Sequence, residues 1–288
     1  MPSIPPGLHD LPDPEYFALD LPSSSGTKTL LHGTNAHLAA ERETPREENE
    51  AFTIGAMVHA LLLAPETVAD AFIRIGRIDR RTTAGKAEWA DALERAALTG
   101  ARIISDDQTA QAEAMTAAVR ANSSASRLID ALTHREVTVI GEIGGRPAKA
   151  KIDGIISSFD SSGAADPCVI VDLKTTLSAA PGEFASSAAK FGYWHQAAWY
   201  RRLTEQHLGI VDDFVVIAVE KTPPHLCAVY RMSALAIHQA DERIDALAAR
   251  WWAVQGGDRT GYPTTISQLD PPAWWTRQQT AENGGGNA

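Results

Sequence analysis

The chain has 288 residues, of which 44% are hydrophobic and 22% charged, and its formal net charge is −10. This length and composition suit one large α/β domain or two small ones, and they exclude a wholly disordered or collagen-like chain. The two cysteines, Cys168 and Cys227, are too few for a disulfide scaffold or for a metal site with four cysteine ligands. Taken alone, the negative charge argues against a protein that coats nucleic acid nonspecifically.

The beginning of the sequence, MPSIPPGLHDLPDPEYF, has neither the basic region nor the apolar core of a signal peptide. No apolar run approaches the roughly 20 residues that a membrane span needs. We therefore expect a cytoplasmic protein that does not enter a membrane. Residues 1–22 are rich in proline and are predicted to form an extended arm.

A helical section is predicted over residues 23–134. Its opening segment, SSSGTK at residues 23–28, is typical of a helix start because its hydroxyl groups can cap the first turn. Residues 74–86 indicate an exposed basic loop. The remaining apolar periodicity predicts helices over residues 51–64, 86–98, 106–121 and 126–132.

The pattern changes to β-branched runs after residue 134, and a sheet core is predicted over residues 135–255. The predicted strands are EVTVIGEI, AKAKIDGIIS, CVIVDLKTT, DFVVIAVEK and LCAVYRM, with helices over residues 193–208 and 234–254. The order indicates one α/β domain over residues 23–255, with a mixed sheet flanked by helices. Residues 256–288, which end in NGGGNA, are predicted to be a mobile tail.

Asp153, Asp172 and Lys174 are the strongest candidates for chemistry. Asp172 and Lys174 are two residues apart on an apolar strand, so their side chains point to the same face. Asp153 ends the preceding strand, and if the two strands pair, both carboxylates meet at one edge and suit Mg²⁺ or Mn²⁺. The alternative is an exposed ion pair at a strand end, and these residues alone leave both readings open.

Two helices carry further candidates. Gln196 and Tyr200 are four residues apart and share a helix face, where they could bind phosphate oxygens or could simply pack at the edge of the core. His59 lies in the apolar helix GAMVHALLLAPE, where a hydrogen-bonded core histidine is the alternative to a metal ligand. Gly55 leaves a flat position on the same helix.

The segment RIGRIDRRTTAGK is locally basic. Arg80, Arg81, Thr82 and Lys86 could bind phosphates, although taken alone they favour a solvated loop. TTAGKAE lacks the first glycine and the final Ser or Thr of a P-loop, so no ATP site is expected.

Taken in order, GAMVHALLLAPE, RIDRRTTAGKAEW, KIDGIIS, VIVDLKTT and YWHQAAWY resemble the RecE-like exonucleases (exonuclease VIII type) of the PD-(D/E)xK superfamily. The resemblance covers about residues 22–232. It implies a restriction-endonuclease-like core with a mixed central sheet. An iron–sulfur cluster, which some relatives hold with four cysteines, is not expected here because the chain has two.

The resemblance also implies a metal site. Asp153 and Asp172 would be the metal-binding carboxylates, and the carbonyl of Leu173 would complete part of the coordination sphere. His59 matches the position at which related nucleases supply a histidine to the metal. Glu142, on the strand before Asp153, is aligned as a further acid near the site.

The other matched residues would act on the substrate. Lys174 would be the catalytic lysine, and Gln196 and Tyr200 match a helix that lines the DNA end. The DRRTTAGK loop would contact the DNA backbone or help to cover the site.

The implied function is Mg²⁺-dependent hydrolysis of linear double-stranded DNA from its ends, 5′ to 3′, in phage-type recombination. The family also implies a ring-shaped homo-oligomer and a single-strand annealing partner of the RecT-like kind. The alternatives are an endonuclease or single-strand nuclease of the same superfamily, and an inactive protein that binds DNA ends. A basic channel within an acidic exterior would reconcile this function with the net charge of −10.

Overall fold

The computed structural model describes residues 4–44, 50–76, 78, 79, 81–158, 166–272 and 275. Its centre is a six-stranded sheet formed, in spatial order, by β1 (Gly7–His9), β4 (His134–Ile143), β5 (Arg146–Ile156), β6 (Cys168–Thr176), β7 (Val211–Glu220) and β8 (Cys227–Arg231). Neighbouring strands are antiparallel except for β6 and β7, which are parallel. The predicted α/β class with a mixed central sheet is therefore confirmed.

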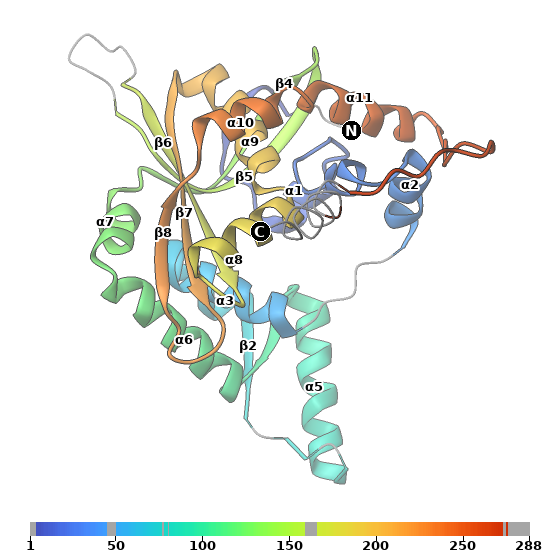
Figure 1. Cartoon of the computed structure of the whole chain (residues 1–288). Coiled ribbons are helices and arrows are strands. Elements are labelled where there is room, and N and C mark those ends of the chain that lie inside the picture. Colours follow the sequence, from blue (N-terminus) through green and yellow to red (C-terminus); the bar gives the residue numbers. More distant parts are fainter. Residues whose placement is uncertain are drawn as a thin grey trace, which may run out of the picture.

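Helices cover both faces of this sheet (Figure 1). They are α1 (Asp13–Ala18), α2 (Asn35–Glu43), α3 (Glu50–Leu63), α4 (Val68–Ala71), α5 (Thr83–Thr99), α6 (Asp106–Ala121), α7 (Ser123–Ala131), α8 (Pro181–Phe191), α9 (Tyr193–Leu208), α10 (Ala234–Asp241) and α11 (Ile244–Gln255), with 3₁₀ turns η1 (Lys28–Leu31) and η2 (Pro65–Thr67). Alternation along β6 separates two cores, because successive side chains point to opposite faces. Val171 and Leu173 pack with α3, α6 and α7, whereas Cys168 and Ile170 pack with α8 to α11.

The predicted helical section differs from the structure at α2, where no helix is predicted, at the 74–86 loop and at SSSGTK. The expected loop at 74–86 begins inside a strand, β2 (Phe72–Ile75), which pairs in parallel with β3 (Arg102–Ser105), and α5 connects the two. SSSGTK does not begin an α-helix. Its hydroxyl groups instead close a turn, in which Gly26 N donates to Ser23 Oγ and Thr27 Oγ1 donates to the Ser23 carbonyl.

The N-terminal segment is more than the extended arm that the prolines predict. Strand β1 pairs with β4, and helix α1 follows it. The buried ammonium group of Lys149 on β5 donates to the carbonyls of Tyr16 (2.7 Å) and Leu19 (2.6 Å). These bonds join the segment to the sheet, although it lacks apolar side chains at a regular spacing.

The first part of the predicted tail also makes contacts. Asn35 Nδ2 donates to Asp258 Oδ2 (2.9 Å), and Ala36 N donates to the Thr260 carbonyl (3.1 Å), so residues 258–260 lie against α2. Residues 273, 274 and 276–288 of the predicted tail lie outside the described residues. Within the described ranges, none of the helices is both long enough and apolar enough to span a bilayer.

Candidate functional site

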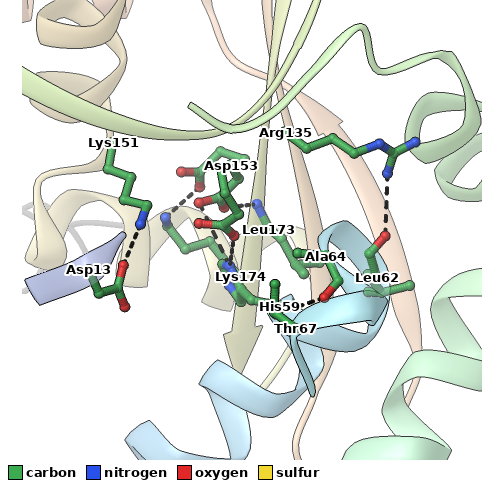
Figure 2. Close-up of polar contacts among 12 residues, drawn as sticks. Asp13, His59, Leu62, Ala64, Thr67, Arg135, Lys151, Asp153, Leu173 and Lys174 are labelled. Atoms are coloured by element: carbon green, nitrogen blue, oxygen red, sulfur yellow. Dashed lines mark hydrogen bonds and ion pairs between the residues drawn. The ribbon is translucent and has the colours of Figure 1, made fainter. Parts of the chain in front are cut away.

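The candidate site lies where β5 and β6 separate. These strands pair only from Gly154 to Ile156 on β5. Asp153, directly before Gly154, and Asp172, directly after its partner Val171, are the first residues beyond the paired region. Asp153 Oδ2 accepts a hydrogen bond of 2.7 Å from Leu173 N, so a carboxylate stands where a strand-to-strand bond would otherwise continue (Figure 2). A Cβ atom at Gly154 would lie 2.5 Å from the Leu132 side chain, which explains why glycine follows Asp153.

Asp172 and Lys174 lie on one face of β6, as the strand periodicity predicts. Lys174 Nζ is 2.5 Å from Asp172 Oδ2. From α9, Gln196 Nε2 donates to Asp172 Oδ1 (2.9 Å) and to the Tyr200 hydroxyl (3.0 Å). The structure therefore brings the predicted pair on β6 together with the predicted pair on α9.

His59 approaches from the opposite face of the sheet, on α3. Its Nδ1 lies 3.7 Å from Asp153 Oδ1 and 3.7 Å from Glu136 Oε1. Arg135 ties this helix to β4, because its guanidinium donates to the Leu62 carbonyl (3.4 Å) (Figure 2). One ligand atom from each of His59, Glu136 and Asp153 can be chosen so that all lie within 4.8 Å of one another.

Glu136 is the site residue that the sequence did not reveal. Counting back from the turn at Gly144 and Gly145 puts it opposite Asp153, since Arg135 pairs with Gly154 and Val137 with Ile152. Its φ is +47°, which is a left-handed conformation that non-glycine residues adopt only at a cost. The strand register was therefore a signal that could have identified it.

The expectation for Glu142 is corrected by the structure. Glu142 is exposed at the other end of β4, opposite Pro147, and its backbone N–H donates to Gln206 Oε1 (2.9 Å). Six residues of strand, or about 20 Å, separate it from Glu136. The acid on this strand that joins His59 and Asp153 is therefore Glu136.

The electrostatics of the cluster favour a bound cation. Burial alone would lower the pKa of His59, but the carboxylates of Asp153 and Glu136 raise it to about 9. Burial raises the pKa of Asp172 to about 6, against the opposing effect of Lys174 and with the help of Asp153. Burial also raises the pKa of Asp153, which His59 and Lys174 oppose. Negative charge is thus crowded together in a poorly hydrated place.

The residues present fit a divalent metal. Asp172 Oδ2 is buried and lacks a hydrogen bond of ordinary geometry within the described part of the chain, although Lys174 is close. Carboxylate oxygens are the hard donors that Mg²⁺ and Mn²⁺ prefer, and the imidazole is a softer nitrogen donor beside them. Asp153, Glu136 and His59 are the group that would hold an ion. Asp172, which is outside this group, and the Leu173 carbonyl stay proposed ligands.

The predicted phosphate-binding residues Arg81, Thr82 and Lys86 lie away from the candidate metal-binding cluster. Arg80 is outside the described residues. Thr82 caps α5 by accepting from Gly85 N (3.0 Å), and Arg81 is an exposed partner of Asp79. This end of α5 lies away from the central sheet, and Lys86 is exposed on its first turns (Figure 1). The structure does not bring Arg81, Thr82 or Lys86 to the cluster.

The family model of the PDDEXK-like domain of unknown function (DUF3799) matches residues 23–264. The chain therefore belongs to this family, and the predicted PD-(D/E)xK core is confirmed. Family membership and the acidic cluster together support a nuclease that uses a divalent metal.

Of two solved structures among those that match this chain, one shows the same fold. One, described as "Putative exonuclease" from Eubacterium rectale, has a TM-score of 0.60 at 15% identity and covers 93% of this chain and 98% of its own. A second, SSO0001, covers 77% of this chain and 85% of its own at 14% identity, but its TM-score of 0.30 is too low to show a shared fold. No curated protein matches this sequence.

Proposed function

We propose that this protein is a Mg²⁺-dependent deoxyribonuclease that hydrolyses linear double-stranded DNA from its ends, in the 5′ to 3′ direction, with Mn²⁺ as the alternative metal. The observation that carries the proposal is the convergence of Asp153, Asp172 and Lys174 where β5 and β6 separate. The description of the structure from Eubacterium rectale supports the choice of an exonuclease.

Each residue has a role in this proposal. A bound Mg²⁺ would polarise the scissile phosphate and make a water molecule more acidic. Asp153 and Asp172 would be ligands of the metal. Gln196 fixes the orientation of Asp172 through its hydrogen bond. The ammonium group of Lys174 orients the attacking water and stabilises negative charge on the phosphate.

The biological setting belongs to the same proposal. A role in phage-type recombination, a RecT-like annealing partner and a ring-shaped homo-oligomer follow from the resemblance to RecE-like exonucleases. Arg81, Thr82 and Lys86, with Arg80, would contact the DNA backbone away from the cluster.

The test compares linear duplex DNA with covalently closed circular duplex and with circular single strands, each with Mg²⁺ or with EDTA. We expect Mg²⁺-dependent loss of the linear duplex alone, and release of nucleotides first from a label at the 5′ end. Equal cutting of the circular duplex would favour an endonuclease, and preferred cutting of single strands would favour a single-strand nuclease. Binding of ends without hydrolysis would favour the inactive end-binding protein.

A further inference from the structure

A cavity of about 220 Å³ lies beside the candidate site, and the roles given above do not use it. It is enclosed between the SSSGTK turn with η1 and the beginning of α9. Lys174 and Gln196 line it as well as the site, so the cavity adjoins Asp172, to which both of these residues are bound.

Two lysines line the cavity. None of the described residues that line it is acidic, although the whole chain has a net charge of −10. The ammonium group of Lys28 is 4.6 Å from the centre of the Phe191 ring, and that of Lys174, which is paired with Asp172 outside the lining, is 5.1 Å from the centre of the Tyr193 ring. Two lysines in the lining of a small cavity favour an anionic ligand.

Hydrogen-bond donors also line the cavity. The hydroxyl-bearing residues Ser24, Ser25 and Thr27 are on one wall, and His195 is on the other. His195 Nε2 is buried and has no hydrogen-bond partner among the described residues. A buried polar atom without a partner is costly unless a ligand or water completes it. Apolar residues, among them Leu31, Trp199 and Leu247, also line the cavity, and low polarity strengthens such interactions.

We propose that this cavity binds one phosphate group of the DNA strand, next to the phosphate that is hydrolysed. The inference rests on the proposed nuclease function, because it is that function which brings DNA to Lys174. Tetrahedral phosphate suits this combination of lysines, hydroxyl groups and imidazole. The phosphate is either an internal backbone phosphate or a phosphate at the end of the strand, and in either case Lys28 is the positioning residue.

Binding measured in EDTA tests this without hydrolysis. The full chain, Lys28→Ala and Lys190→Ala are titrated with short duplexes that end in a 5′-phosphate or a 5′-hydroxyl, and with duplexes that carry one neutral methylphosphonate at a defined position. Lys190 is the matched control, because it is an exposed lysine that also approaches Phe191 (5.6 Å) but does not line the cavity.

We expect Lys28→Ala to weaken binding of the unmodified duplex about tenfold, as the loss of a charged hydrogen bond predicts. The duplex in which the phosphate bound by the cavity is absent or neutral should bind wild type and Lys28→Ala equally, because Lys28 then has no charge to contact. A 5′-hydroxyl substrate with this behaviour identifies a terminal phosphate, and a methylphosphonate substrate identifies an internal one. Lys190→Ala should weaken binding of every duplex by the same small factor.

The proposal is overturned if Lys28→Ala weakens binding of all these duplexes equally, because that result describes general attraction rather than a phosphate site. Wild-type protein gives an independent readout, since neutralising the bound phosphate should weaken binding more than neutralising any other. Hydrolysis of linear duplex with Mg²⁺ is measured in parallel. If wild type hydrolyses the duplex but the effect of Lys28→Ala does not depend on one particular phosphate, only the cavity proposal fails. If wild type hydrolyses nothing, the proposed function fails.

Discussion

Two buried charges on neighbouring strands differ in the kind of partner that satisfies them. Lys149 on β5 is 5% exposed and donates to two main-chain carbonyls. Asp172 on β6 is 1% exposed, and the partner of its Oδ2 is the Lys174 side chain, whose Nζ is 2.5 Å away. Burying a charge is costly unless its partners are complete. Lys149 is therefore held by fixed main-chain atoms, whereas Asp172 depends on a side-chain cation of the candidate site.

The largest effect is expected at the carboxylates. Asp153→Asn should lower Mg²⁺-dependent hydrolysis of linear duplex about 1,000-fold, because it removes a charged metal ligand. Titration with Mn²⁺ should show the same loss in metal affinity, while the melting temperature stays at or above that of wild type because crowding among the acids is relieved. Unchanged Mn²⁺ affinity would show that Asp153 is not a ligand.

Glu136 and Glu142 form a matched pair on one strand. Glu136→Gln should reduce metal affinity and hydrolysis about 10- to 100-fold, since it faces His59 and Asp153. Glu142→Gln should leave both unchanged, because Glu142 is exposed at the far end of β4. If Glu142→Gln reduced metal affinity and hydrolysis and Glu136→Gln did not, Glu142 would be the acid of the site.

The structural role of Lys149 is tested by the pH dependence of the free energy of unfolding. Burial lowers the pKa of Lys149 to about 8, below its ordinary value of 10.5. Between these pH values the folded state binds fewer protons than the unfolded state, so this group makes folding more favourable as pH rises. Urea unfolding at pH 7.5 and pH 10 should show wild type gaining about 2 kcal/mol relative to Lys149→Met. Parallel changes in the two proteins would show that Lys149 does not titrate in this range.

The smallest effect is expected at Arg81, which is exposed and lies two residues before α5, at the end of that helix that is away from the central sheet. Arg81→Ala should weaken DNA binding about two- to threefold and reduce the salt dependence by about one phosphate contact. Binding measured across a series of salt concentrations checks this. An unchanged salt dependence would remove Arg81 from the DNA contacts.

The fold was predictable where local pattern and long-range pairing agree. The β-branched runs gave the strands of the sheet core, and D-x-K spacing placed Asp172 and Lys174 on one face. The N-terminal segment was not predictable in this way, because β1 and α1 are held by Lys149 and by Lys151, which bonds to Asp13 (Figure 2). Such contacts join residues more than 130 positions apart and leave no periodic signal.

The candidate site was also predictable only where it depends on local spacing in the sequence. Residues with a fixed spacing, such as Gln196 and Tyr200, were found from the sequence. Glu136 was not, because its place depends on the register of the hairpin between β4 and β5 and on a left-handed backbone conformation. The resemblance aligns Glu142, which lies on the same strand, but strand identity does not fix which end of a strand meets the site.

The most direct test of a metal-dependent nuclease site is digestion of a linear, end-labelled duplex by wild type and by Lys174→Ala, with Mg²⁺ and with EDTA. We expect wild type to digest the duplex only with Mg²⁺, and Lys174→Ala to lose nearly all of this activity while it unfolds at a temperature close to that of wild type. Undiminished Mg²⁺-dependent digestion by Lys174→Ala would contradict the assignment of this site.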